Sequence, residues 1–444
     1  MIANKAEILA DLGGGLVMRR STPEDADRLC AFNGRIHGDD PADAEAVAVW
    51  TRDLLTCPHP TFKPDDFVIV TDTASGEIVS SLNLISQTWT YEGIPFGVGR
   101  PELVGTDAAY RNRGLVRKQF EVVHEWSRQR GELVQVITGI PYFYRQFGYE
   151  MGLDLSGGKG GYEAQVPQLE EGKEEPYFIR PATRDDLPWV SKMHARDVKR
   201  SMVAALRDEA LLLYEIDGAS EKNVNHYKPC VITDSDGKLV GYMVHPNGTW
   251  GKMMSVVRYQ LDEGVSYMAV NPSIIRYLWK VGQEYAARSE RTLNAFGFWL
   301  GSEHPAYRAT PGRFVFERPP YAFFVRVPDL PAFLTCIGTV LEQRLASSAC
   351  AGHSGELKIS FYREGVRLVF EKGKLVSAEA WKPKVKDDEG SAAFPALTFL
   401  QLVFGYRTQD ELRHAYADCW ASEEARVLID ALFPKKYSSI WPIS

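Results

Sequence analysis

The sequence predicts an α/β protein of several domains, and three observations support this fold class. The chain has 444 residues, which is more than a single hydrophobic core usually accommodates. Hydrophobic residues make up 45% and charged residues 25%, as in globular proteins that fold in water. Segments with the pattern of strands alternate with segments with the pattern of helices. We therefore expect roughly two to four domains built from both kinds of element.

A weak internal repeat divides the first part of the chain. The segment MRRSTPEDADRL (18–29) is similar to IRPATRDDLPWV (179–190), and in each a strand-like start leads to a threonine and then to acidic residues. Thr22 and Thr183 can each cap a helix, because an aspartate follows three residues later, near the position that a capping box requires. The two segments therefore predict the same strand-to-helix connection twice.

A second similarity supports the same division. FVIVTDTASGEIVSSL (67–82) and CVITDSDGKLVGYMV (230–244) each have a strand, an Asp/Gly turn and a second strand, which is the pattern of a β-hairpin. Two copies of one α/β unit explain both similarities. The glycine-rich segment SGGKGG (156–161), followed by a charged stretch, is typical of a linker between them. The expected domains are 1–160, 161–325 and 326–444.

The most informative segment is YRNRGLVRKQF, which begins at Tyr110. It places four basic residues around Gly114 in a chain whose formal net charge is -7. The acidic balance argues against general binding of nucleic acid or of anionic membranes, since both need a positive surface. A local basic cluster in such a chain therefore indicates a local anion.

The context of this basic segment predicts an anion cradle. A short strand, PELVGTD (101–107), precedes it, an amphipathic helix follows, Gly131 marks the end of that helix, and LVQVIT (133–138) is a buried strand. A helix N-terminus has unpaired N–H groups and partial positive charge, so it binds phosphate well. The alternative is a solvated basic helix face, which the flanking strands make the weaker interpretation.

These residues resemble a known group of enzymes. YRNRG followed by LVRKQ resembles motif A of the GNAT acyltransferase superfamily, [QR]-x-x-G-x-[GA], although Val116 stands at the last small position. This variant, together with YRQFGYE (144–150), is similar to the enhanced intracellular survival (Eis-type) acetyltransferases. The resemblance implies tandem GNAT domains, of which the second is degenerate, and a C-terminal sterol-carrier-protein-like α/β domain. It also implies acetyl-CoA as co-substrate and an amine as acceptor.

The resemblance also implies roles for individual residues. Tyr144 matches the tyrosine that serves as general acid, and a local pattern aligns Trp50 with an aromatic residue that lines the amine pocket. The corresponding stretch of the second copy, 267–280, has no arginine–glycine turn, so that copy should not bind the cofactor. The expected cofactor-binding residues are Val104, Gly105, Thr106, Arg111, Asn112, Arg113, Gly114, Leu115, Val116 and Arg117.

Transfer of acetyl to an amine also needs a base, because the attacking amine must be neutral. In the resembled family the chain terminus is buried in the active site and its α-carboxylate acts as base, which makes Ser444 the candidate here. The last residues, SSIWPIS, carry three large apolar side chains that favour burial. The alternatives are a tail that packs on its own domain and His37 as base.

Composition excludes several other classes. Six scattered cysteines without a CxxC pair argue against a structural zinc site, so we expect no metal. The first residues lack the apolar core of a signal peptide, and no apolar run is long enough to span a bilayer, so a reducing cytoplasm is the expected location. A homo-oligomer is expected from the resemblance, whose members form hexamers. The alternative function is a non-enzymatic carrier of an apolar ligand in the C-terminal domain.

Overall fold

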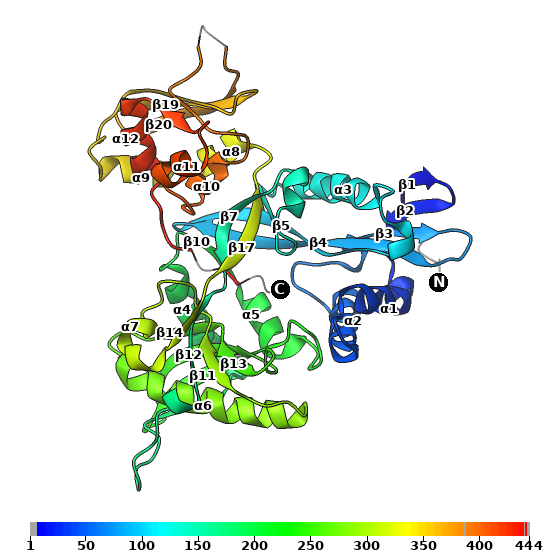
Figure 1. The fold of residues 1–444 in the computed structure, drawn as a ribbon, viewed down its shortest axis with the longest axis vertical. Helices are drawn as coiled ribbons and strands as arrows, with labels where there is room; N and C mark the ends of the chain where they lie inside the picture. Colours follow the sequence, from blue (N-terminus) through cyan, green and yellow to red (C-terminus); the bar gives the residue numbers. More distant parts are fainter. Residues whose placement is uncertain (1–6, 385–387, 439, 442–444) are drawn as a thin grey trace.

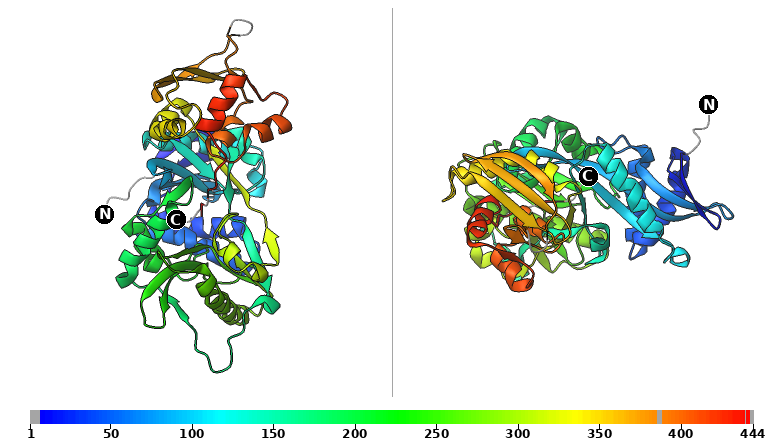
Figure 2. Two further views of the ribbon diagram at one scale, coloured as in Figure 1. Left: turned by 90° about the vertical axis from the view of Figure 1, so that its left-hand side faces the viewer. Right: turned by 90° about the horizontal axis from the view of Figure 1, so that it is seen from above.

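The computed structural model describes residues 7–384, 388–438 and 440–441. Mixed α/β folding is confirmed, because four sheets of four to nine strands are packed with helices. The chain forms three adjoining parts (Figure 1). Figure 2 shows from the side that the middle part, in green, and the C-terminal part, in orange and red, lie at opposite ends with the N-terminal sheet between them.

The N-terminal part is built on a nine-stranded sheet in the order β1-β2-β3-β4-β5-β6-β17-β7, with β10 paired to β4. Helix α3 covers one face of this sheet, and α1 and α2 cover the other (Figure 1). Its elements are β1 (Ile8–Gly13), β2 (Leu16–Arg20), α1 (Ala26–His37), α2 (Pro41–Thr56), β3 (Phe67–Asp72), β4 (Ile78–Tyr91), β5 (Ile94–Thr106), α3 (Leu115–Gln129), β6 (Val134–Ile137), β7 (Glu150–Leu155), β10 (Val203–Leu206) and β17 (Tyr321–Arg326).

Strands β5 and β6 separate at the centre of this sheet. They run in parallel and pair only at Val98 with Val134 and at Gly99 with Gln135. Beyond these pairs β5 continues to Thr106, and Leu103 takes a positive φ of 51° where the pairing of β4 with β5 shifts its register. The described residues of β5 beyond Gly99 therefore have no strand partner on the β6 side, and their backbone is open to a ligand.

The middle part contains two four-stranded sheets, in the orders β14-β12-β11-β9 and β13-β15-β8-β16. The interpretation of residues 156–161 as a linker is wrong, because most of them form β8, which lies between β15 and β16. The glycines there permit close packing: a Cβ on Gly160 would lie 2.4 Å from the Phe316 ring. The elements are β8 (Gly158–Tyr162), β9 (Tyr177–Pro181), α4 (Leu187–Val198), α5 (Glu209–Leu213), β11 (Tyr227–Asp234), β12 (Leu239–Pro246), β13 (Met253–Val256), β14 (Arg258–Leu261), α6 (Tyr267–Arg288), β15 (Ala295–Phe298), α7 (Ala306–Ala309) and β16 (Phe316–Arg318).

Two strands cross between the parts. β17 lies antiparallel between β6 and β7, and β10 pairs with the far end of β4, so residues after the first unit complete its sheet. The sheets therefore do not end at residues 160 and 325, and the division of the chain at these positions stays a prediction. The exchange ties the N-terminal and middle parts together through backbone hydrogen bonds.

The internal repeat has a matching structure in both copies. Arg19 forms two hydrogen bonds of 2.7 Å with Asp25, and Asp25 accepts from the backbone N–H of Thr22 at 2.9 Å. Arg180 and Asp186 repeat the arrangement with bonds of 2.6 and 2.8 Å. The two predicted hairpins are also confirmed, as β3–β4 and β11–β12.

The C-terminal part has one five-stranded sheet in the order β20-β19-β18-β21-β22, with helices packed on it. Thr408 and Ser422 cap its last two helices, α11 and α12, by accepting bonds from Glu411 and Ala425 N–H at 3.1 and 3.3 Å. The elements are α8 (Leu330–Cys336), α9 (Gly338–Ala346), β18 (Gly355–Ser360), β19 (Gly365–Glu371), β20 (Lys374–Trp381), β21 (Ala392–Ala393), α10 (Phe399–Val403), α11 (Gln409–Ala415), β22 (Trp420–Ala421) and α12 (Glu423–Leu432).

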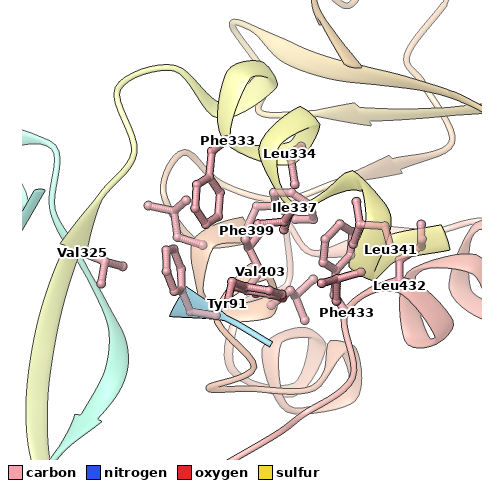
Figure 3. Packing of buried hydrophobic residues seen from close by; sticks show 14 of the residues in the cluster. Tyr91, Val325, Phe333, Leu334, Ile337, Leu341, Phe399, Val403, Leu432 and Phe433 are labelled. Atoms are coloured by element: carbon pink, nitrogen blue, oxygen red, sulfur yellow. The ribbon is translucent and has the colours of Figure 1, made fainter. Parts of the chain in front are cut away.

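A continuous hydrophobic core joins the C-terminal part to the end of the β4–β5 hairpin (Figure 3). Tyr91 of β4 is fully buried beside Phe333, and its hydroxyl donates a 2.7 Å hydrogen bond to the Val403 carbonyl. Arg344 bonds both this hydroxyl, at 3.0 Å, and Glu92, at 2.9 Å. The C-terminal part is therefore packed on the first sheet and is not merely tethered to it. Within the described ranges, no helix is both long and apolar enough to cross a membrane.

Candidate active site

The turn between β5 and α3 has a backbone that only certain residues tolerate. Asn112 and Gly114 both adopt left-handed conformations, with φ of 63° and 73°. Glycine adopts this conformation without strain, and asparagine tolerates it better than most residues. Gly114 is the N-cap of α3 and has no side chain to bond the first-turn N–H groups. These donors are therefore left for a ligand.

Three arginines surround this helix N-terminus, and their side chains are held mainly by neutral groups. Arg111 donates to the Thr106 carbonyl at 3.4 Å, and Arg113 donates to the Ala109 carbonyl at 3.2 Å. Arg117 donates to the Gln146 side chain at 2.8 Å. Their positive charges thus remain available to an anion. The fourth basic residue, Lys118, lies near a carboxylate of the next helical turn and does not line the cleft.

A cleft of about 770 Å³ opens over this turn. It is lined by all of the residues that the sequence predicted to bind the cofactor, from Val104 to Thr106 and from Arg111 to Arg117. It is also lined by Ile36, His37, Ile140 and Tyr144. Unpaired N–H groups, three guanidiniums and an open strand fit an elongated ligand that carries phosphates.

Helix α1 approaches the open strand closely at Gly105. A Cβ on Gly105 would lie 2.6 Å from Ile36 Cγ2 and 3.1 Å from His37 Nε2, so glycine is required for this contact. His37 Nε2 is buried and has no hydrogen-bond partner among the described residues. Burial lowers the pKa of His37, and the Glu102 carboxylate and a backbone bond at Leu103 offset this only in part. His37 is therefore a neutral imidazole at neutral pH.

Tyr144, which also lines the first cleft, lies in the short 3₁₀ helix Phe143–Phe147 that follows β6. Its side chain is buried against Phe120 and Phe324, and its hydroxyl lies close to Gly139. Burial, together with the nearby Glu102 charge, raises the pKa of Tyr144 well above that of a free tyrosine. The phenol therefore keeps its proton throughout the physiological range.

A second cleft, of about 460 Å³, adjoins the first. Four residues line both clefts: His37, Val104, Ile140 and Tyr144. Trp50 of α2, predicted to line an amine pocket, is buried in the wall of this second cleft. The structure therefore brings Tyr144 to the junction of the two clefts and Trp50 into the second.

Sequence reasoning missed several residues of the second cleft. Arg100 and Glu102 of β5 line it and form a 2.5 Å ion pair with each other. Val224, Asn225 and Tyr227 of the middle part line its opposite side. Arg100 and Glu102 stand next to the predicted strand residues and could have been found by extending that motif, whereas no local signal marks the other three.

The loop that supplies Val224 and Asn225 is docked on α2 through a buried carboxylate. Asp53 accepts bonds from the backbone N–H and hydroxyl of Ser220, at 2.9 and 2.6 Å, and from the Asn223 amide at 2.7 Å. Val224 N–H also donates to the Ala46 carbonyl at 3.2 Å. The middle part thus forms one wall of the second cleft through contacts with α2.

Replacing Asp53 with alanine should release this loop. Three donors would lose a charged acceptor, and bonds of this type make a net contribution of about 1.5–3 kcal/mol each. We expect a lower Tm and faster cleavage by trypsin after Lys222, whose side chain is exposed within the loop. Both are measured on the full-length protein.

Glu45→Ala is the matched control, because Glu45 of α2 contacts the same loop only through an exposed 2.7 Å ion pair with Lys222. Exposed pairs contribute about 0–1 kcal/mol, so the Tm and the cleavage rate should stay close to those of the parent protein. Equal behaviour of the two variants would contradict the docking role of Asp53.

The C-terminal tail reaches the second cleft. Ile440 is buried and forms a parallel bridge with Leu155, and Trp441 lines the cleft and stacks on Trp250 with ring centroids 5.6 Å apart. The expected burial of these two side chains is confirmed for Ile440 and is partial for Trp441. Ser444, the predicted base, lies outside the described residues.

Comparison with known proteins agrees with this geometry. Residues 18–152, which hold the open strand, the basic turn and Tyr144, match the family model described as the acetyltransferase (GNAT) domain. The chain carries a GNAT acetyltransferase domain. Domains of this fold use acetyl-CoA as co-substrate, and the residues that line the cleft of about 770 Å³ lie within the matched region.

Solved structures share the fold over nearly the whole chain. A probable N-acyltransferase from Enterococcus faecalis is 13% identical, with a TM-score of 0.64 over 97% of this chain and 100% of that one. A GCN5-related N-acetyltransferase from Kribbella flavida is 16% identical, with a TM-score of 0.64 over 97% and 98%. Eis1 from Mycobacterium abscessus is 13% identical, with a TM-score of 0.57 over 98% of both chains. The fold beyond the GNAT domain is therefore shared as well.

A curated protein matches over a shorter region. A quinohemoprotein alcohol dehydrogenase of Pseudomonas putida, ADH-IIG, is 32% identical over 120 residues, which are 26% of this chain. The matched region spans only 15% of that dehydrogenase.

In residues 7–384, 388–438 and 440–441, no group of three or more His, Cys, Asp or Glu side chains could hold a metal ion.

Proposed function

We propose that the protein is an acetyl-CoA-dependent N-acetyltransferase that transfers acetyl directly to a small-molecule amine. The meeting of two clefts at Tyr144 carries this proposal, since each cleft can hold one of two substrates. Holding both substrates in one site removes several kcal/mol of the barrier, roughly 7–11 kcal/mol at best. Acetyl-CoA would supply an activated thioester, and no covalent enzyme intermediate is needed.

The residues of the first cleft are proposed to bind acetyl-CoA along its length. Arg111, Arg113 and Arg117 with the N–H groups that follow Gly114 would hold the pyrophosphate. The backbone of β5 from Val104 to Thr106 would bond the pantetheine and polarise the acetyl carbonyl. The separation of β5 from β6 supports this, because it leaves that backbone open.

Tyr144 is proposed to protonate the leaving thiolate. Tyr144 lines both clefts, which supports this role, and its raised pKa keeps the proton available. A phenol of high pKa is a weak acid in the ground state, but a thiolate that forms beside it in a buried site is a ready acceptor.

For the base we propose the α-carboxylate of Ser444, as the resemblance implies. The support is that Trp441, three residues earlier, lines the second cleft, which we assign to the amine and call the acceptor cleft. His37 is the second candidate, because it is neutral, borders both clefts and has an unpaired Nε2. A carboxylate and an imidazole differ in pKa, so they can be separated experimentally.

Addition of two glycines after Ser444 should distinguish these bases. The extension moves the terminal carboxylate and leaves every side chain in place. We expect turnover to fall by about 10²–10⁴-fold with unchanged acetyl-CoA affinity. The same glycines added before Met1 are the control. Full activity of the extended enzyme would instead favour His37, and His37→Gln should then lower kcat and remove the acidic limb of the pH–rate profile.

The acceptor is proposed to be a cationic amine of the polyamine or aminoglycoside class. The net charge of -7 and the Glu102 carboxylate in the acceptor cleft support a cation, although Arg100 neutralises part of that charge. Release of free thiol from acetyl-CoA over a panel of polyamines, aminoglycosides and peptides tests both the activity and the acceptor class. No thiol release with any amine would contradict the proposal.

A second candidate function rests on the C-terminal part, which we propose to be a sterol-carrier-protein-like domain. A mainly apolar cleft of about 430 Å³ lies between α8, β19, β20 and α10, where Trp381, Phe361 and Leu400 are among the lining residues. A protein that retained a lipid on purification but failed to bind acetyl-CoA would be a carrier and not an acetyltransferase. We also propose a homo-oligomer in solution, which light scattering would test.

A further inference from the structure

A small cavity of about 30 Å³ lies where the middle part of the chain meets the tail, beside the acceptor cleft. Trp441 lines both, and the other walls come from α4, β10, β14 and the segments near Leu300 and Tyr437. A cavity needs about 10–15 Å³ to hold one water, so this one accommodates an occupant about as large as one or two waters. Neither the proposed reaction nor the cofactor cleft uses it.

The charged side chains in and next to the wall of this cavity include more arginines than carboxylates. Glu215 is buried, and each of its oxygens accepts from a different arginine, Arg207 Nε at 2.7 Å and Arg258 Nη2 at 2.8 Å. Burial alone would raise the pKa of Glu215, but the two guanidiniums outweigh it and lower the pKa to about 2. The carboxylate is therefore ionised, and each of its oxygens is engaged by one guanidinium.

The remaining charges do not balance. Arg200, the third arginine in the wall, pairs with Asp197 at the more exposed side of the cavity. Burial lowers the pKa values of His194 and His304, so both lining imidazoles are neutral. The three guanidiniums of the wall thus have two carboxylate partners, Asp197 in the wall and Glu215 behind it, which leaves one positive charge in a largely buried place.

The unmet hydrogen-bond donors of this cluster are concentrated on Arg258. This side chain is 6% exposed, and its Nε and Nη1 have no hydrogen-bond partner among the described residues. Arg207, in contrast, uses Nε for Glu215 and donates from Nη2 to the Trp441 carbonyl at 3.4 Å. Water could accept from the free N–H groups of Arg258 but would leave the charge uncompensated, whereas an anion would accept from one of these groups and also compensate the charge.

We propose that this cavity, with Arg258 as its principal ligand, is a binding site for a small monovalent inorganic anion of halide size. Its volume is too small for a phosphate-bearing molecule, and its excess of one positive charge matches a single negative charge. Arg258 and Arg207 share the single carboxylate of Glu215, and Arg207 also bonds the Trp441 carbonyl. An anion that compensates the charge of Arg258 would therefore stabilise the junction between β14, β10 and the tail residue Trp441.

Crystals of the full-length protein grown in potassium bromide test the site directly. We expect an anomalous bromide peak within hydrogen-bond distance of Arg258 Nε or Nη1, the two donors that have no partner among the described residues. Absence of bromide there, or occupation of the cavity by the chain's own terminal carboxylate, would overturn the proposal. Bromide in the crystal without any effect on stability in solution would indicate an adventitious ion only, and would overturn it too.

Thermal unfolding tests the site in solution. At equal ionic strength, 0.2 M potassium bromide should raise the Tm by roughly 2–4 °C over 0.2 M potassium gluconate, since only the smaller anion fits. Arg258→Met should abolish this difference, because it leaves Glu215 and Arg207 as a neutral pair. Arg276→Met removes another partly buried, ion-paired arginine of the same part and should retain it. If Arg258→Met does not fold, the bromide position in the parent protein decides.

Discussion

Replacing Tyr144 with phenylalanine should lower turnover by about 10²–10⁴-fold, which is the usual contribution of a general acid, and should leave acetyl-CoA affinity unchanged. The ring packs against Phe120 and Phe324, so phenylalanine keeps these contacts and removes only the hydroxyl. The hydroxyl makes no hydrogen bond to another described side chain, so its loss should cost little stability. Steady-state thiol release and calorimetric titration with acetyl-CoA measure the two quantities.

Tyr142→Phe is the control for this experiment. Tyr142 is two residues away and 68% exposed, and it lines neither cleft, so its hydroxyl should not affect turnover.

Burial holds the pKa of Tyr144 far above neutrality, so no alkaline limb of the pH–rate profile is expected from this group below about pH 10. Unchanged turnover in Tyr144→Phe would show that solvent or another group protonates the thiolate.

The second large effect is expected at Gly114, where an aspartate should weaken acetyl-CoA binding by about 10²-fold. A carboxylate at the N-cap of α3 would repel the pyrophosphate and would occupy the first-turn N–H groups that otherwise serve the ligand. The structure shows a φ of 73°, so a residue other than glycine costs about 1 kcal/mol and should lower the Tm slightly.

Gly114→Asn separates the charge from this backbone effect. Asparagine has the same shape as aspartate and tolerates the left-handed conformation, and no atom lies within 4 Å of a Cβ built at this position. We expect equal Tm values for the two variants but a much smaller loss of affinity for asparagine, by calorimetry. Equal affinities would mean that the anion does not bind at this helix N-terminus.

The cofactor cleft could be predicted from sequence because it is local. Its strand, basic turn and helix start occupy one continuous segment from Val104 to Arg117, and each of these three follows from a short-range rule, whereas the opening of β5 from β6 is a tertiary feature. Tyr144 follows one strand later. The structure places these residues around one cleft, while their proposed roles remain to be tested.

The strand exchange could not be predicted in the same way. The pattern of Gly158–Tyr162 gave no sign that it is a strand, because glycines carry no hydrophobic alternation, yet it packs between β15 and β16. Similarly, the apolar pattern of β17 indicates burial but not its partners, β6 and β7. Periodicity reports which face of a strand is buried, whereas the choice of neighbouring strands depends on packing across the whole molecule.

The sequence by itself therefore determined the α/β class, the repeated capping motif at Asp25 and Asp186, and the basic turn at the start of α3. Only the tertiary structure decided the acceptor cleft, since its walls come from Trp50 in α2, from the loop at Asn225 and from Trp441 in the tail. These segments are far apart in the chain and carry no common motif. They meet because Asp53 is buried against the middle part and because the tail packs beside β7, and such contacts form only when all three parts have folded together.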